Sequence, residues 1–156
     1  MNNRVFKTHK QSIAHRPEEG LYGDCMRACY AMMLGVEPNE VPHFVDPALF
    51  PEDWVGARNQ WFAERGLVRV DIPFPGEHSF DFIVKLLGDF ARTAPVMILG
   101  QSPRGDWNHC VVSYRGEMFD PHQSDDGLVG PCPEDNLYWV TVLSLNFPNV
   151  ATDRES

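Results

Sequence analysis

Residues 23–35 read GDCMRACYAMMLG, and this stretch decides the fold. Asp24 is a good N-cap residue and Gly35 is a typical helix stop, so the stretch predicts a helix from Cys25 to Leu34. Apolar side chains recur on nearly every side of that helix. We therefore expect a helix buried in the core, with a cysteine at its first position.

Cys25 lies at the N-terminus of the predicted helix, where a thiol becomes more reactive. A thiol is a useful nucleophile only as a thiolate, and the unpaired N–H groups and dipole of a helix N-terminus lower its pKa. Gly23 lets another segment of the chain approach the thiol closely. Cys29, one turn further along, fits a small buried hydrophobe, which is also the alternative for Cys25. We predict that Cys25 is the nucleophile.

The flanking sequence predicts an α+β domain. Two further helices are expected over residues 51–65 and 80–90, and strands are expected over 67–72, 96–99, 109–114, 117–120 and 138–145. Helices thus come first, followed by a mostly antiparallel sheet, on which the N-terminal helices would pack. Residues 1–23 are polar and suit an irregular arm. No repeat or low-complexity linker divides the chain, so we expect one domain over residues 1–156.

A histidine and an aspartate flank a predicted hairpin. His109 opens one strand, Asp120 closes the next, and Arg115-Gly116 can form the two-residue turn between them. In that register His109 and Asp120 lie diagonally on the same face, so the carboxylate can orient the imidazole and stabilise its charge. His122 falls on the same face, so the two histidines could exchange roles. A surface histidine beside a turn aspartate is the plain alternative.

A cysteine, a histidine and a carboxylate in this order favour nucleophilic acyl transfer. Such a site needs oxyanion donors, which the Cys25 backbone N–H and the side chain of Gln11, the one glutamine before the cysteine, could supply. Gln11 could equally face solvent. The cleft would also involve Trp107 and Asn108, beside the catalytic strand. Trp107 could contact substrate or pack over the histidine.

The composition limits the partners. With 13 basic and 22 acidic residues, a formal charge of -9 and no basic run, the chain is a poor match for nucleic acid. The polar N-terminus lacks an apolar stretch for export or membrane insertion, so we expect a cytoplasmic protein without membrane contact. Oligomeric state stays open.

Four cysteines and six histidines raise the question of a metal site. No Cys-x-x-Cys or His-x-x-x-His pair occurs, and His109 and Cys110 point to opposite faces of one strand. We therefore expect no metal and no cofactor. In a reducing cytosol the cysteines would be free thiols.

Several short motifs carry a resemblance to a known family. They are Gln11, Pro17-Glu18, Gly20, Gly23-Asp24-Cys25, Glu40-Val41-Pro42-His43-Phe44, Ser102-Pro103-Arg104-Gly105, Asn108-His109 and Asp120-Pro121-His122. From about Gln11 to Leu128 the chain resembles small phage and bacterial proteins. These are similar to the papain-like superfamily, especially the leader-peptidase domains of bacteriocin exporters, in which a Gln precedes the Cys and the His strand pairs with a strand ending in Asp-Pro.

The resemblance implies a role for each residue of the site. Cys25 would be the nucleophile, His109 the general base, Asp120 the orienting carboxylate and Gln11 the oxyanion-hole donor. Apart from the resemblance, the position of Gly23, Asp24, Trp107 and Asn108 next to Cys25 and His109 in the sequence leads us to expect that they contact substrate.

Together these features predict a papain-like cysteine hydrolase that cleaves a peptide, isopeptide or related amide bond in a peptide or protein substrate. Two alternatives stay open. The same three residues could hand the acyl group to an amine, as in a thiol acyltransferase or transglutaminase-like enzyme. The fold could also serve as a non-catalytic, phage-encoded binding module with an acidic surface.

Overall fold

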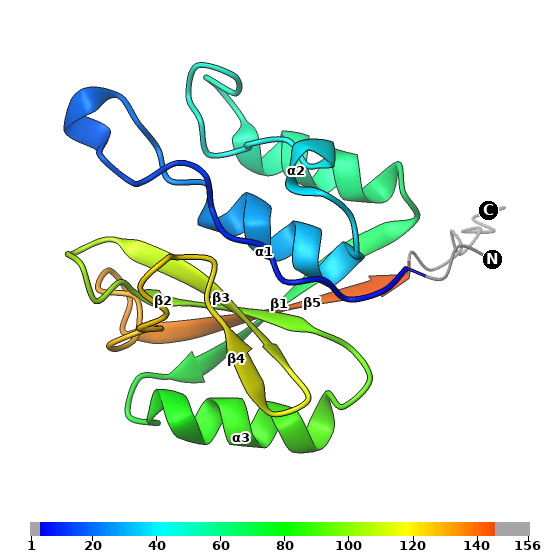
Figure 1. Ribbon diagram of the computed structural model, residues 1–156, viewed down its shortest axis with the longest axis vertical. Helices are drawn as coiled ribbons and strands as arrows, with labels where there is room; N and C mark the ends of the chain where they lie inside the picture. The colour runs from blue at the N-terminus through cyan, green and yellow to red at the C-terminus, as the bar shows by residue number, and fades with distance from the viewer. Residues whose placement is uncertain (1–3, 146–156) are drawn as a thin grey trace, which may run out of the picture.

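The computed structural model describes residues 4–145, which form a sheet with helices on both faces (Figure 1). The helices are α1 (Cys25–Leu34), α2 (Trp54–Ala63) and α3 (Phe80–Phe90), with short 3-10 turns at Pro17–Glu19 and Pro38–Glu40. The strands are β1 (Leu67–Pro75), β2 (Val96–Gln101), β3 (Asn108–Tyr114), β4 (Glu117–Phe119) and β5 (Leu137–Leu145).

The five strands lie in the order β1-β5-β2-β3-β4, and every neighbouring pair is antiparallel. The α1 and α2 helices lie on one face of this sheet and α3 lies on the other (Figure 1). The prediction of an α+β fold with an antiparallel sheet is therefore confirmed. Residues 4–23 form an arm that is irregular apart from the first 3-10 turn and an Arg16–Leu21 bridge.

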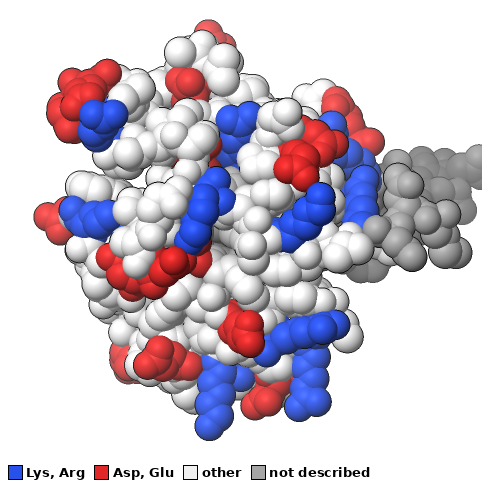
Figure 2. All heavy atoms as spheres, in the orientation of Figure 1, with Lys and Arg blue, Asp and Glu red and all other residues white. Residues whose placement is uncertain are grey.

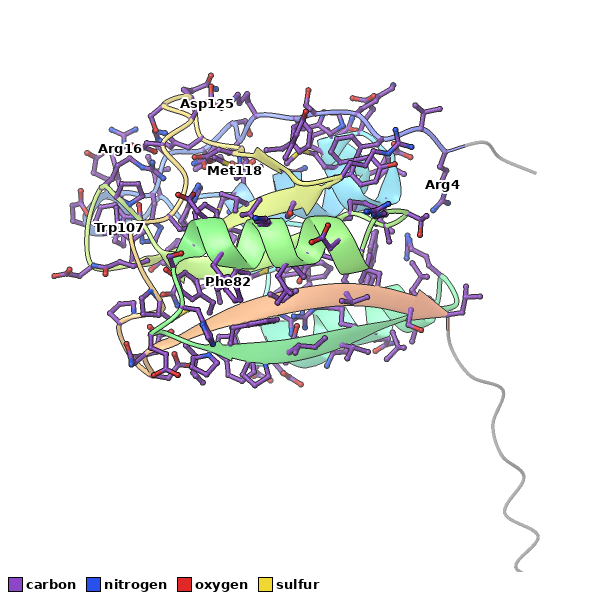
Figure 3. All side chains as sticks on the ribbon, turned by 90° about the horizontal axis from the view of Figure 1, so that it is seen from below. Arg4, Arg16, Phe82, Trp107, Met118 and Asp125 are labelled. Atoms are coloured by element: carbon purple, nitrogen blue, oxygen red, sulfur yellow. The ribbon has the colours of Figure 1, made fainter. Side chains whose placement is uncertain are left out.

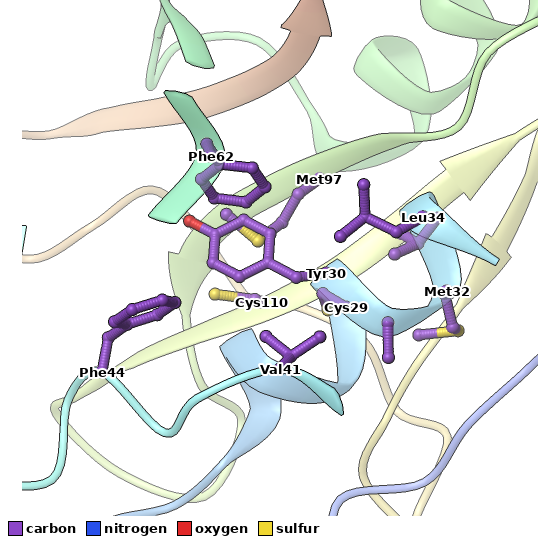
Figure 4. Close-up of a cluster of buried hydrophobic side chains, with 11 residues drawn as sticks. Cys29, Tyr30, Met32, Leu34, Val41, Phe44, Phe62, Met97 and Cys110 are labelled. Carbon is purple, nitrogen blue, oxygen red and sulfur yellow. The ribbon is translucent and has the colours of Figure 1, made fainter. Parts of the chain in front are cut away.

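The α1 helix is buried, as its apolar composition predicts. Cys29, Tyr30 and Ala31 are fully buried, and they belong to a cluster that α1 forms with β2, β3 and Phe62 of α2 (Figure 4). Gly35 ends the helix with φ 64°, a left-handed conformation that glycine adopts without strain. The helix thus holds its N-terminal residue against the sheet.

The other two helices begin at capping side chains. Asp53 Oδ1 accepts a hydrogen bond from the Gly56 N–H at 2.8 Å, so α2 begins at Trp54, three residues later than the expected start at Pro51. Ser79 Oγ accepts a hydrogen bond from the Phe82 N–H at 3.2 Å and caps α3, as predicted.

The sequence predicts an apolar face on each of these helices, and both faces need correction. The predicted apolar residues are Trp54, Val55, Trp61 and Phe62 in α2 and Phe82, Ile83, Leu86, Leu87 and Phe90 in α3. In α2, Val55 is 41% exposed, and the buried residues are Arg58 and Phe62. Of the four predicted apolar residues of α2, Phe62 alone is fully buried. In α3, Ile83 is buried but Phe82 is 46% exposed. The predicted stripe also included Phe90, whose side chain lies outside the described part of the structure.

The β3–β4 hairpin positions the predicted site. Arg115 and Gly116 have φ values of 54° and 78°, as a two-residue hairpin turn requires. Val112 pairs with Phe119 and Tyr114 pairs with Glu117, which is the predicted register. His109 and Asp120 therefore lie beside each other at the end of the hairpin away from the turn.

None of the helices within residues 4–145 combines the length and the apolar character needed to cross a membrane. On the face seen in Figure 2, acidic and basic side chains are intermixed, and the basic ones form no continuous area.

Candidate active site

Three segments far apart in the sequence bring Cys25, His109 and Asp120 together. Cys25 is the first residue of α1, His109 is the second residue of β3, and Asp120 directly follows β4. His109 Nε2 and Asp120 Oδ1 are 2.7 Å apart, and Cys25 lines the same cleft as His109, whose imidazole lowers the pKa of the thiol. Because α1 packs against β3, the helix N-terminus and the imidazole meet directly.

Asp120 is held as a charged acceptor. Besides His109, the carboxylate accepts backbone N–H bonds from His122 to Oδ1 and from Gly127 to Oδ2, each at 2.8 Å. Burial alone would raise the pKa of Asp120, but the hydrogen bond from His109 and these two backbone bonds lower it overall. Asp120 can therefore orient the imidazole and stabilise its positive charge.

The imidazole of His109 is favoured in its protonated form. Burial lowers its pKa, but the hydrogen bonds and the negative charges of Asp120 and Cys25 outweigh burial and raise the pKa to about 9. His122 differs, because burial and the charge of Arg104 lower its pKa. Its Nδ1 is 2.7 Å from Ser124 Oγ, and its ring centroid is 6.3 Å from that of His109. The geometry gives the role beside Cys25 to His109.

Cys25 is favoured as a thiolate. A hydrogen bond from the Cys110 thiol lowers its pKa most, burial opposes this, and the hydrogen bond and charge of His109 lower it further. The pKa of Cys110 is raised in turn by that hydrogen bond and by burial. Sequence alternation placed Cys110 on the face of β3 opposite His109, yet Cys25 interacts with both side chains.

Cys29 has the environment of a core residue, as predicted. Its side chain is fully buried, and burial and the negative charges of Cys25 and Asp120 raise its pKa. All four cysteines are free thiols. The two cysteines of α1 therefore differ in exposure and in the direction of their pKa shifts, as a reactive thiol and a packing residue should differ.

Asp24 fixes the N-terminal arm and does not line the cleft. Its side chain is 1% exposed and accepts hydrogen bonds from Ser12 N at 2.9 Å, Ser12 Oγ at 2.8 Å and Ile13 N at 2.8 Å. It makes no side-chain cap to α1. Asp24 thus holds the arm beside the start of α1. We expected Asp24 to contact substrate directly, and its buried side chain does not support that prediction.

The arm brings Gln11 to the cleft. Gln11 N donates to Pro121 O at 2.8 Å, and Gln11 Nε2 donates to Ile13 O at 2.8 Å. The second hydrogen of that amide nitrogen remains for a ligand, while Oε1 has no hydrogen-bond partner among the described residues. The predicted oxyanion donor therefore lies in the same cleft as Cys25.

Gly23 allows the arm to pass close to the start of α1. A Cβ at this position would lie 3.0 Å from the Cβ of His15, tighter than most side-chain contacts. The segment that approaches Gly23 is thus the N-terminal arm, and the sequence analysis did not identify which segment it would be. Gly23 also lines the cleft.

A cleft of about 660 Å³ opens at Cys25. Its apolar wall consists of Met26, Val45, Trp54 and Leu99, none of which we predicted as site residues. These side chains come from segments that also supply core residues, so their composition alone gave no signal of a cleft.

The polar end of the cleft carries the predicted Trp107 and Asn108. The Trp107 ring lies 5.4 Å from that of His15 and against Gly105, and Figure 3 shows Trp107 at the same end of the molecule as Arg16 of the arm. Asn108 Nδ2 donates to Glu134 Oε1 at 2.5 Å. Trp107 therefore both packs against the arm and lines the cleft, and Glu134 is a further lining residue that the sequence analysis missed.

A larger, shallower groove of about 800 Å³ lies between α3 and the β3–β4 turn. Its lining contains no thiol and no imidazole, so it offers no nucleophile. Within residues 4–145, no three His, Cys, Asp or Glu side chains are grouped as they would be to hold a metal ion.

Replacing Asp24 with alanine should release the arm. The change removes the buried carboxylate that accepts three hydrogen bonds from Ser12 and Ile13, so we expect a loss of about 2–3 kcal/mol in the free energy of unfolding. Urea denaturation measures this. Asp24→Asn, which keeps one acceptor oxygen, should lose less, and an unchanged stability in Asp24→Ala would contradict the role given to Asp24.

His109 and His122 should differ in charge at pH 7.5. With a pKa of about 9, His109 should remain an imidazolium, while His122 should be neutral. The folded pKa of His109 exceeds the unfolded value of about 6.5, so its positive charge stabilises the fold. This stabilisation is fully present below pH 6.5 and is lost as the pH rises through 9. Ring ¹⁵N shifts from NMR titration measure both groups, and a midpoint for His109 at or below that of His122 would contradict the proposed environment.

Comparisons of the chain with models of protein families, with curated proteins and with solved structures found no match. We therefore infer function from the geometry of the site.

Proposed function

We propose that this protein is a papain-like cysteine hydrolase that cleaves a peptide, isopeptide or related amide bond through a thioester on Cys25. The observation that carries the proposal is the convergence of Cys25, His109 and Asp120 from α1, β3 and the end of β4, with Asp120 hydrogen-bonded to His109 and Cys25 in the same cleft as His109. A structural cysteine needs no such partners. A thiolate beside an oriented imidazolium is what acyl transfer to sulfur requires.

The reaction follows from the charges of these groups. The Cys25 thiolate attacks the carbonyl carbon, and the His109 imidazolium gives its proton to the leaving amine, which leaves a thioester. Neutral His109 then takes a proton from water, which attacks the thioester, and the proton returns to the sulfur as the acid product leaves. Asp120 holds the imidazole in the orientation for both proton transfers.

The developing oxyanion needs two donors. Cys25 is the first residue of α1, so its backbone N–H has no partner within the helix, and Gln11 Nε2 retains a second hydrogen in the same cleft. Only the Gln11 assignment depends on the arm. The anchoring of the arm by Asp24 and by the Gln11–Pro121 backbone bond supports a fixed position for that amide.

The apolar wall supports a peptide as the substrate. Met26, Trp54 and Leu99 offer apolar contact to a side chain next to the scissile bond, while Asn108 and Glu134 offer polar contact in the same cleft. A peptide presents both kinds of surface within a few residues.

The test is digestion of a mixed library of unstructured peptides in H₂¹⁸O, followed by mass spectrometry. We expect new C-termini that contain one ¹⁸O, because water resolves the thioester. Addition of an amine shows by mass whether the acyl group passes to nitrogen instead, which would identify an acyltransferase. The control is protein alkylated at Cys25 with iodoacetamide. No cleavage, or cleavage that survives alkylation, would refute the hydrolase.

A further inference from the structure

A second thiol lies directly beside the nucleophile. Cys110 of β3 is 1% exposed, lines the same cleft as Cys25, and belongs to the buried cluster against which Cys25 packs. Figure 4 shows the Cys110 side chain within the cluster that α1 packs against. The hydrolytic reaction uses only one of these two sulfurs, so the contact between them needs its own explanation.

We propose that Cys25 and Cys110 form a reversible disulfide when a hydroperoxide oxidises Cys25. This makes the pair a modification site that protects the nucleophile. The proposal rests on the thiolate reactivity that the proposed function assigns to Cys25, but not on hydrolysis.

The first step oxidises the exposed sulfur. Cys25 is partly exposed in the cleft, whereas Cys110 is buried, so a hydroperoxide meets Cys25 first. The thiolate attacks one peroxide oxygen, a sulfur–oxygen bond forms, and the oxygen–oxygen bond breaks. The departing alkoxide or hydroxide takes the proton of the His109 imidazolium. Cys25 becomes a sulfenic acid, and the peroxide is reduced to an alcohol or water.

The second step joins the two sulfurs. The Cys110 sulfur attacks the sulfenic sulfur, the sulfur–sulfur bond forms, and the sulfur–oxygen bond breaks. The departing hydroxide takes the Cys110 proton and leaves as water. In total, two thiols lose two electrons and two protons to one hydroperoxide. Burial raises the pKa of Cys110, which keeps that sulfur a thiol until Cys25 has become electrophilic.

Neither of the other cysteines fits the role of Cys110. Cys29 lies four residues along α1, where Cβ atoms are about 5–6 Å apart, and a disulfide needs about 3.8 Å. Cys132 is fully buried and does not line the cleft. Of the three other cysteines, Cys110 alone lines the cleft with Cys25.

The test treats reduced protein with one equivalent of hydrogen peroxide, unfolds it, blocks the remaining thiols with N-ethylmaleimide, and maps peptides without reduction. We expect a mass loss of two hydrogens, two blocked thiols instead of four, and a linked peptide pair that contains Cys25 and Cys110. Dithiothreitol should restore all four thiols. With two equivalents of peroxide the wild type should still stop at the disulfide, whereas in Cys110→Ala, which has no second thiol, Cys25 should gain two oxygens as a sulfinic acid that dithiothreitol cannot reverse.

Cys29→Ala is the matched control and should behave as the wild type does. Should Cys110→Ala fail to fold, the peptide map of the wild type still decides, since a linkage to Cys29 or irreversible oxidation of Cys25 there overturns the proposal. Iodoacetamide labelling of the reduced protein separates the two proposals. If Cys25 is labelled fast but forms no disulfide, only the disulfide proposal is refuted. If Cys25 is labelled as slowly as Cys29, the reactive thiolate is refuted, and with it both the disulfide and the hydrolase.

Discussion

Replacing Cys25 with alanine is expected to abolish cleavage in the peptide-library assay, with a loss of about 10⁴-fold or more. No other described group occupies the place of the sulfur at the N-terminus of α1, so without the thioester route only uncatalysed attack by water remains. The fold should survive. Cys25 is partly exposed, and the change removes one sulfur atom, which should cost about 1 kcal/mol or less in unfolding free energy.

The matched control is Cys29→Ala, one turn further along the same helix. Cys29 is fully buried among Tyr30 and other core side chains, so its loss should cost on the order of 1 kcal/mol while activity is retained. Urea denaturation and the same cleavage assay measure both variants. Retained activity in Cys25→Ala together with loss in Cys29→Ala would move the nucleophile to Cys29.

The local elements were predictable where one strong signal acted alone. The α3 helix has the predicted bounds because Ser79 caps it and an apolar residue recurs at helical spacing. The β3–β4 hairpin was predictable because Arg115-Gly116 suits the left-handed turn. The start of α2 was misplaced because the capping by Asp53, two residues after Pro51, decides it.

The arrangement of the strands was not predictable from such signals. β5 is the last strand in sequence, yet it lies between β1 and β2. Alternating apolar residues tell which face of a strand is buried, but several strands with the same pattern can pair equally well by that criterion. The order depends on how the helices cover the two faces, which is a property of the whole chain.

The part of the candidate site that lies on the β3–β4 hairpin was predictable, because the hairpin itself was. The register placed Asp120 beside His109, and the structure has that contact. The anchoring role of Asp24 was missed because its partners, Ser12 and Ile13, belong to an arm without periodic pattern. Cys110 was missed because strand alternation does not say where the end of a distant helix will lie.

The second large effect is expected for His109→Ala, in which the Cys25 thiolate loses its counterion. The hydrogen bond and charge of His109 lower the pKa of Cys25, so this pKa should rise in the variant, while the Cys110 hydrogen bond and the helix N-terminus preserve part of the depression. Alkylation of Cys25 by iodoacetamide at pH 6 should then slow by about tenfold or more, because the rate follows the thiolate fraction.

The measurement is the pH dependence of Cys25 alkylation, followed by peptide mass spectrometry so that the other three thiols do not contribute. The control is His122→Ala, since His122 lies close to His109 but is bonded to Ser124, and its profile should match that of the wild type. Cleavage should fall by about a hundredfold or more in His109→Ala, because the leaving amine then lacks its proton donor. This test needs no known substrate for its first part. Identical alkylation profiles in wild type and His109→Ala would refute the contact between thiolate and imidazolium, and with it the proposed mechanism.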